Sequence, residues 1–129
     1  MEKQIEPENL NMYKAKLLAE LSRHIGKHNA IGMGELYSRV FDKSWGHKIN
    51  DTRQIRRVVT TLRNEGVPIC SASDCNTGGY YLASAGSELE NYCSRIRRRG
   101  LQALMMEAKI RRTALPELLG QIQLSLNGA

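Results

Sequence analysis

Apolar residues recur every three or four positions after Pro7, and this spacing predicts an amphipathic helix that runs to about Ile25. Proline suits the first turn, where no backbone N–H is needed, and Gly26 suits the end. Residues 30–32 are long enough only for a short extended segment, and residues 34–41 are predicted to form a second short helix. The expected apolar faces of these two helices comprise Leu10, Tyr13, Leu17, Leu18, Leu21 and Ile25, and Leu36, Val40 and Phe41.

The third predicted helix follows a polar connector, residues 42–50, that contains Trp45. The helix starts with Asn50 or Asp51 as a side-chain cap and ends at Gly66. On a helical wheel one face of this helix is apolar and the opposite face is cationic. The apolar stripe is Ile55, Val58, Val59 and Leu62; Arg53, Arg57 and Thr60 point away from it, and Arg56 and Arg63 lie on one flank.

Two short apolar segments, residues 67–71 and 79–83, are predicted to pair as a β-hairpin, because turn-forming residues fill the positions between them. Pro68 suits the start of the first strand. A capping-box pattern, Ser87-Glu88-Leu89-Glu90, then predicts the start of a long helix, and Pro116 begins a last amphipathic helix. The apolar residues of this last helix are Leu118, Leu119, Ile122 and Leu124.

The long helix is apolar on two sides, and a helix of this kind needs a second partner. After Gly100, Leu101 and Met105 add a second apolar face to the first stripe. We expect the long helix and the last helix to form a homodimer. The alternative is an intrachain fold-back, in which the last helix covers Leu101 and Met105 in a monomer and Gly100 allows a bend. The first stripe comprises Leu89, Tyr92, Cys93, Ile96, Gly100, Ala103, Leu104 and Ile110.

The composition of the 129 residues, 41% hydrophobic and 25% charged, is typical of a globular protein. No apolar run reaches the length of a membrane span, and the polar, acidic N-terminus is unlike a secretory signal. Three cysteines are an odd, sparse set that fits a reducing compartment better than a disulfide scaffold. We therefore expect a cytoplasmic protein with a flexible N-terminus, residues 1–7, and no membrane partner.

The formal net charge is +6, and arginines concentrate in residues 51–63 and 95–112. A segregated basic surface attracts polyanions such as nucleic acids. The same arginines can also serve only to keep the protein soluble, or to cover neighbouring apolar area with their stems. Charge alone leaves both interpretations open.

The segment 51–69, followed by Gly78-Gly79-Tyr80-Tyr81-Leu82, resembles the winged helix-turn-helix domain of biotin-repressor-type regulators and short winged-helix proteins of phages and mobile elements. In that family the recognition helix reads roughly Arg-x-Ile-x-Arg-x-Ile-x-x-Leu, and Gly-x-Pro-Ile and Gly-Gly-Tyr-x-Leu flank the wing. The resemblance covers residues 10–85. It implies a mainly α fold with a small β-hairpin wing and binding of double-stranded DNA. The connector at 42–50 is longer than the tight turn of that family.

The expected organisation is therefore a winged-helix domain at residues 8–85 and a helical extension for dimerisation or partner binding at residues 86–129. A recognition helix lies in the major groove, where Arg and Gln can make two-pronged contacts to base edges. Thr60 is expected at a phosphate or a thymine methyl group. A purely solubilising role of this helix face is the alternative. The expected base contacts are Arg53, Gln54 and Arg57, and the expected phosphate contacts are Arg56 and Arg63.

Small polar residues in the wing can contact the sugar-phosphate backbone, although turn formation alone also explains their presence. The wing contains no Lys or Arg, so no deep insertion into the minor groove is expected. The long helix offers a second basic surface, either for DNA or for an acidic protein partner. The wing residues are Ser71, Ser73, Asn76 and Thr77, and those of the basic helix are Arg95, Arg98 and Arg99.

Metal binding and catalysis find little support in the sequence. His24 and His28 lie four residues apart on a predicted helix, and Cys70 and Cys75 lie on the hairpin, so a His2Cys2 zinc site is conceivable. Because these spacings match no strong zinc signature, we expect no metal and no cofactor. Cys93 is interpreted as a small core residue. No phosphate-binding glycine loop, catalytic-serine motif or zinc-protease motif is present, so we expect no enzyme activity.

Two functions follow from these expectations. The first is a double-stranded DNA-binding protein, either a sequence-specific transcriptional regulator or a phage-type replication or packaging accessory protein. The second is a protein-interaction adaptor that uses a winged-helix scaffold and the basic long helix to dock an acidic partner. Only the first function depends on Arg53 and Arg57, so these two residues discriminate between the hypotheses.

Overall fold

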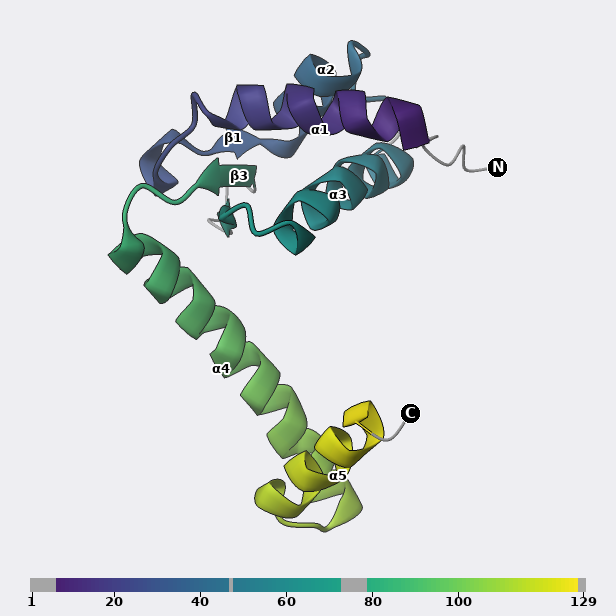
Figure 1. The fold of residues 1–129 in the computed structure, drawn as a ribbon, viewed down its shortest axis with the longest axis vertical. Helices are drawn as coiled ribbons and strands as arrows, with labels where there is room; N and C mark the ends of the chain where they lie inside the picture. Colours follow the sequence, from purple (N-terminus) through teal and green to yellow (C-terminus); the bar gives the residue numbers. More distant parts are fainter. Residues whose placement is uncertain (1–6, 47, 73–78, 128–129) are drawn as a thin grey trace. The chain divides into compact units, whose positions relative to one another are not determined.

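The computed structural model describes residues 7–46, 48–72 and 79–127. The fold is mainly helical and contains a small three-stranded antiparallel sheet (Figure 1). The chain divides into two compact units, Met1–Leu89 and Glu90–Ala129. This boundary falls inside the long helix, a few residues after the expected boundary at residue 85. Residues 1–6 of the expected flexible N-terminus lie outside the described residues, and Pro7 already belongs to the first helix.

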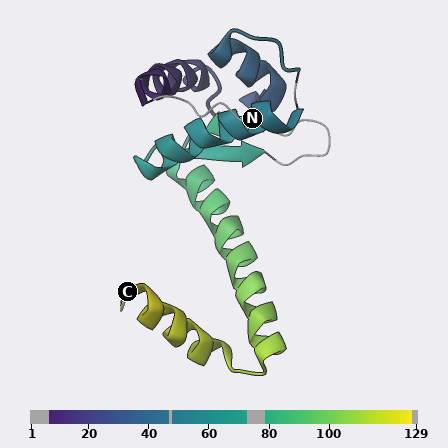
Figure 2. The ribbon, with the colours of Figure 1, turned by 90° about the vertical axis from the view of Figure 1, so that its right-hand side faces the viewer.

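In the first unit, helices lie beside the sheet (Figure 2). The strands are ordered β1-β3-β2, and both pairings are antiparallel. Tyr80 of β3 lies opposite Ile31 of β1 on one side and opposite Ser71 of β2 on the other. The elements are α1 (Pro7–Leu21), η1 (Lys27–Asn29), β1 (Ile31–Gly32), α2 (Met33–Phe41), α3 (Lys48–Asn64), β2 (Ile69–Ala72) and β3 (Gly79–Leu82).

The core of this unit forms where the apolar faces of the three helices meet the sheet. The apolar stripe predicted for α3 is buried along its whole length. Tyr13 and Tyr37 each pack a ring against Phe41, at centroid distances of 4.3 and 4.8 Å. The buried cluster comprises Leu17, Leu21, Ile31, Leu36, Tyr37, Val40, Phe41, Ile55, Val58, Val59, Leu62, Ile69 and Tyr80.

The first helix ends at Leu21, so the prediction that it continues to Ile25 is wrong. The backbone after Leu21 pairs instead with the end of β3: the N–H of Gly26 donates to the carbonyl of Leu82, and the N–H of Leu82 donates to the carbonyl of His24. Gly26 has a φ of 90°, which an α-helix does not allow. Ile25 is therefore 48% exposed rather than buried, and Leu18, another predicted core residue, is also exposed.

The third helix begins at Lys48, so neither Asn50 nor Asp51 is its cap. Asp51 is buried in the first turn, where its carboxylate accepts a hydrogen bond from the backbone N–H of Gly46 at 3.0 Å and another from the hydroxyl of Tyr37. The carboxylate thus joins the connector, α2 and α3. Burial, together with the hydrogen bond and negative charge of Asp51, raises the pKa of the Tyr37 hydroxyl.

The predicted end of the third helix at Gly66 is confirmed. Gly66 has a φ of 91°, a left-handed conformation that glycine adopts without strain. Its N–H donates to the carbonyl of Arg63 at 2.9 Å, and the N–H of Val67 donates to the carbonyl of Leu62 at 3.1 Å. These two bonds form a Schellman motif, which stops the helix and turns the chain toward the hairpin.

The hairpin forms as expected, but its first strand begins at Ile69 rather than Val67. Pro68 has no N–H for a strand ladder, although its carbonyl still accepts a hydrogen bond from Ala83. Gly79 lies so close to β1 that a Cβ atom there would approach the Ile31 carbonyl oxygen to 1.9 Å. Glycine at this position is therefore a requirement of the β1–β3 pairing.

The long helix α4 (Gly86–Arg111) begins before the predicted capping box, which is therefore wrong in register. The side chain of Glu88 reaches back and accepts a hydrogen bond from the N–H of Ser84 at 2.9 Å. It also accepts a bond from the N–H of Lys27 at 3.3 Å. The hydrogen bond from the Ser84 N–H lowers the pKa of the Glu88 carboxyl most strongly, and the bond from the Lys27 N–H lowers it further. Together they outweigh the partial desolvation of the carboxyl, which by itself would raise the pKa.

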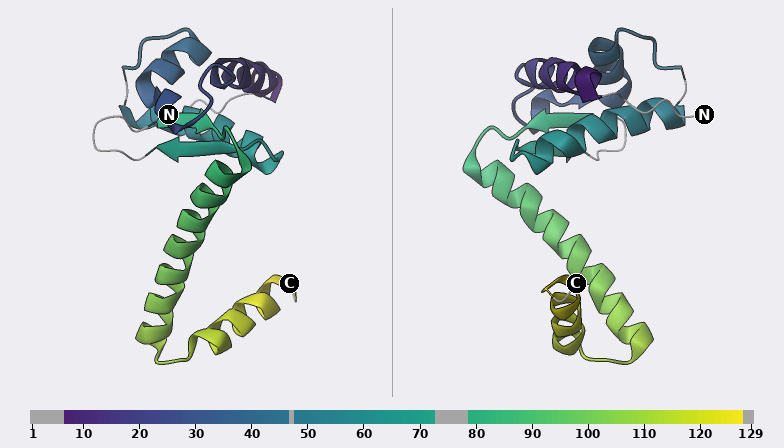
Figure 3. Two further views of the ribbon diagram at one scale, coloured as in Figure 1. Left: turned by 90° about the vertical axis from the view of Figure 1, so that its left-hand side faces the viewer. Right: turned by 45° about the vertical axis from the view of Figure 1, so that its right-hand side comes forward.

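The second unit consists of the remainder of α4 and helix α5 (Leu115–Asn127). The chain reverses at Arg112, and the two helices diverge from this turn (Figure 3). Ala108 and Leu118 are buried, so a fold-back contact exists, but Leu101 and Met105 remain 40% and 45% exposed. Cys93 is also exposed, so its interpretation as a core residue is wrong.

Candidate nucleic-acid interface

Most of the DNA-contacting residues predicted for α3 lie on the exposed side of this helix. Ile55 and Val58 are completely buried on one side of this helix. The opposite side is solvent-exposed, as the helical wheel predicts, whereas Gln54 is partly buried at its edge. The exposed residues of this α3 face are Arg53, Arg56, Arg57 and Thr60.

The charge of the α3 face is uniformly positive, because the one acidic residue in the sequence of this helix points elsewhere. Asp51 is buried and accepts the N–H of Gly46. Glu65, just after the helix, forms an ion pair with Lys14 of α1. Both carboxylates are thus held by groups of the same unit, and the arginines supply the charge that faces solvent.

Arg63, which was expected at a phosphate, has a different environment. Its Nε donates to the carbonyl of Ile69 at 2.9 Å, and a terminal nitrogen donates to the hydroxyl of Ser71 at 3.0 Å. Its guanidinium also lies 5.8 Å from the ring centroid of Tyr80. Arg63 therefore ties the end of α3 to β2 and β3. Two of the predicted contact residues, Arg63 and Ser71, are bound to each other.

The remaining predicted wing residues, Ser73, Asn76 and Thr77, lie outside the described residues. Trp45 packs against α2 rather than on the exposed face of α3. Its side chain is 38% exposed in the connector that leads into α3. A Cβ at residue 34 would approach the ring of Trp45 to 2.2 Å, so Gly34 provides the surface on which the ring packs.

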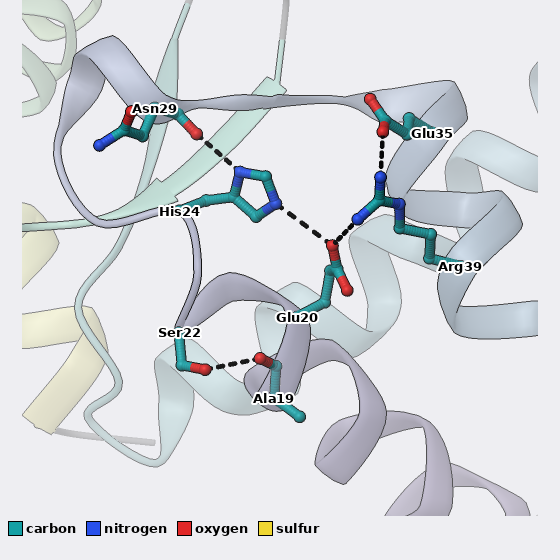
Figure 4. A network of polar contacts seen from close by, with 7 residues as sticks. All are labelled: Ala19, Glu20, Ser22, His24, Asn29, Glu35 and Arg39. Carbon is teal, nitrogen blue, oxygen red and sulfur yellow. Dashed lines mark hydrogen bonds and ion pairs between the residues drawn. The ribbon is translucent and has the colours of Figure 1, made fainter.

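The predicted pair His24 and His28 does not share a helix: His24 follows α1, and His28 belongs to η1. The ring of His24 instead lies between the carbonyl of Asn29, at 2.8 Å from Nδ1, and the carboxylate of Glu20, at 3.2 Å from Nε2 (Figure 4). Both partners offer oxygen atoms that can accept hydrogen bonds from the ring. Across the described ranges, no group of three His, Cys, Asp or Glu residues could hold a metal ion.

Glu20 also accepts a hydrogen bond from Arg39 at 2.5 Å, and a second nitrogen of Arg39 donates to Glu35 at 2.5 Å (Figure 4). Burial alone would raise the pKa of the Glu20 carboxyl, but the hydrogen bonds and positive charges of His24 and Arg39 together lower it below its ordinary value. This network joins α1, the segment before β1, and α2. Its geometry is that of a structural tie within the first unit.

The second basic surface lies on α4 in the second unit. The guanidinium of Arg95 lies 5.7 Å from the ring centroid of Tyr92 on the same helix. The three arginines at positions 97–99 of α4 are also exposed, so this side of the helix carries a dense positive charge. The exposed cations of this surface are Arg95, Arg97, Arg98 and Arg99.

Cys70 is buried in β2, and Cys75, the other cysteine of the zinc site that the sequence analysis weighed and did not favour, lies outside the described residues. In the part of the chain that the structure describes, no helix is long and apolar enough to cross a membrane.

Comparisons with known protein families, with curated proteins and with solved structures find no match to this chain.

Proposed function

We propose that residues 8–85 form a winged helix-turn-helix domain that binds double-stranded DNA through α3. The order of elements supports this proposal, since two helices with a short strand between them precede α3 and a hairpin follows it. The sheet order β1-β3-β2 places the hairpin directly against the short strand. The observation that carries the proposal is the α3 face itself, a row of exposed cations opposite a fully buried apolar stripe.

In the proposed complex, α3 lies in the major groove. Arg53 and Arg57 are spaced four residues apart, so both project from the same side of the helix toward base edges. Gln54 at the edge of this side offers a further two-pronged contact. Arg56 and Thr60 contact phosphates, with Thr60 also in reach of a thymine methyl group. Arg63 acts indirectly, because its hydrogen bonds fix the hairpin next to α3.

The biological role that fits such an interface is sequence-specific regulation of transcription, or an accessory step in replication or packaging of phage-type DNA. Both roles need recognition of a defined duplex sequence. A preferred site is therefore the property to measure first. Selection of bound oligonucleotides from random duplex DNA identifies it, and fluorescence anisotropy then measures affinity for the selected site and for a scrambled duplex.

The first prediction concerns the two outward arginines. Arg53→Ala and Arg57→Ala should each weaken binding to the selected site by about 1–3 kcal/mol, because each removes a base contact. Binding to the scrambled duplex should fall much less. Arg56→Ala is the matched control: it removes the same charge from the same helix and should weaken both duplexes alike. Equal affinity of the wild type and the Arg53/Arg57 double variant for the selected site would refute the interface.

A second candidate function has one observation in its favour. The exposed arginines of α4 form a basic surface that a protein with an acidic segment fits. An adaptor of this kind would keep its partner when Arg53 and Arg57 are replaced, and would lose it when Arg98 and Arg99 are replaced. The same variants, tested by anisotropy on DNA, separate the two functions.

A further inference from the structure

In the second unit, α4 carries a mostly apolar line that no described element of this unit covers. Ile96, Ala103 and Ile110 are spaced seven residues apart. Cys93 and Gly100 precede the first two of them by three residues, and Glu107 holds the corresponding position before Ile110. Apart from Glu107, these residues are exposed, Ile96 to 49% and Ile110 to 75%. We call this line the α4 seam. Its spacing is the heptad spacing of helices that pair along one side.

Ala108, which is buried in this unit together with Leu118 of α5, lies on a different side of α4. The residues that mark this side are Leu101, Leu104 and Ala108, of which Ala108 is buried. On a helical wheel their mean direction lies roughly 100° from the α4 seam. Among the described residues of the second unit only Ala108 and Leu118 are buried, so this unit has too small a core to be stable by itself.

We propose that the α4 seam packs against the same seam of a second copy of the chain, as an antiparallel helix pair. The two-fold axis lies between residues 101 and 102, where Gly100 of each copy meets Ala103 of the other. Small side chains at the crossing let the two helices approach closely. In this register Cys93 of one copy lies opposite Ile110 of the other, and Ile96 lies opposite Glu107, whose carboxylate is bound to Arg111 of its own helix.

The placement of opposite charges at the two ends of α4 favours a second, antiparallel copy of the helix as the partner. Glu90 and Arg111 lie on the same flank of the α4 seam, at opposite ends of the helix. Antiparallel pairing brings Glu90 of each copy to the partner's Arg111, whose Nε already binds Glu107 at 2.7 Å and whose other nitrogens remain as donors. Because the pair has two-fold symmetry, the contact between Glu90 and Arg111 forms twice.

A parallel pair is unfavourable because it brings like charges of the two copies together. In a parallel pair in register, Glu107 would meet Glu107, and the cluster at residues 95–99 would meet its own copy. Antiparallel pairing separates the two copies of Arg97 by about nine helical steps, or roughly 13 Å along the axis. The two copies of Arg97 are then farther apart than a Debye length at physiological salt.

The second prediction tests the surface with two neighbouring residues of the full-length protein. Ala103→Glu places a charge in the α4 seam, whereas Gln102→Glu places the same charge on the adjacent basic side. Both residues are exposed, so both variants should keep the wild-type helical signal in circular dichroism. Sedimentation equilibrium should show a dimer whose dissociation constant rises at least tenfold in Ala103→Glu and less than threefold in Gln102→Glu. A wild-type monomer at high micromolar concentration, or equal effects of the two variants, would overturn the proposal.

The orientation is tested by disulfide cross-linking in a Cys75→Ser background. Ile110→Cys should cross-link to Cys93 of the other copy under mild oxidation, because these positions lie in one layer. Cys93 without the new cysteine should not cross-link, since two copies of Cys93 are separated by about 25 Å along the axis. Efficient Cys93–Cys93 linkage would overturn the antiparallel register. The Arg53/Arg57 double variant should dimerise normally, so failure here is distinct from failure of the DNA proposal.

Discussion

At the scale of single residues, Arg63 and Arg56 show what a helical wheel can and cannot predict. Both lie on one flank of the apolar stripe of α3, so the sequence pattern treats them alike. Arg56 is exposed, but Arg63 binds Ile69 and Ser71 of the hairpin. The difference depends on where the hairpin lies, and local periodicity carries no information about that position. The outward direction of Arg53 and Arg57 was predictable because it follows from the helix alone.

The third prediction follows from this contrast. Arg63→Ala should lower the free energy of unfolding by about 1–2 kcal/mol, because two hydrogen bonds and the contact with Tyr80 are lost. Arg63→Lys should recover only part of this loss, since an ammonium cannot reproduce the planar fork of a guanidinium. Urea denaturation measures both. Arg56→Ala is the control and should change stability by less than about 0.5 kcal/mol; an equally small effect of Arg63→Ala would contradict the positioning role.

At the scale of elements, the helices and the hairpin could be predicted, but their boundaries could not. The apolar repeat of α1 continues past Leu21 in the sequence, yet the backbone at His24 and Gly26 bonds to Leu82 of β3. Pairing with a strand far along the chain therefore overrides the local helix pattern. The same applies to Asp51, whose side chain serves the connector rather than the helix start. Each error concerns a contact between segments that are distant in sequence.

The fourth prediction uses the pairing of Gly79 with Gly32 across β1 and β3. Gly79→Ala should destabilise the first unit by more than about 2 kcal/mol, because the new methyl group would collide with the Ile31 carbonyl and force the strands apart. Gly32→Ala is the matched control: a Cβ there meets nothing within 4 Å, and its φ of −64° suits alanine. Thermal unfolding monitored by circular dichroism should separate the two variants clearly. A similar midpoint for both would show that β1 does not approach β3 as closely as described.

At the scale of the whole molecule, the two units differ in how they achieve stability. The first unit has a continuous core and polar ties between its elements, whereas the second exposes the apolar line of α4. The sequence indicated that α4 has two apolar sides, whereas Ala108 is the one buried residue among the described residues of α4. In our proposal, the placement of charges along α4 selects the partner of the α4 seam, which is why the interface is tested through single charges.

The Glu20 network gives the first unit a dependence on pH. Glu20 binds His24 and Arg39, so protonation of its carboxyl would weaken the tie between α1, the segment before β1, and α2. Its pKa is lowered in the folded protein, where partial burial opposes but does not outweigh these two partners. A lowered pKa means that the unfolded chain binds the proton more readily. The stabilisation is therefore complete above the unfolded value of about 4.3 and is lost as the pH falls through the lower, folded value.

The fifth prediction is that Glu20→Gln reduces the loss of unfolding free energy that the protein suffers as the pH falls below about 5. In the wild type the free energy of unfolding, measured in urea, should fall between about pH 5 and pH 3. Glu20→Gln should be less stable than the wild type at pH 7 and should lose less stability over the acid range, because the amide has no proton to gain. Glu35→Gln is the control, since Glu35 binds the same Arg39 but is more exposed and has no bond to His24. If the acid limb of Glu20→Gln has the wild-type slope, the lowered pKa of Glu20 does not contribute to the stability of the first unit.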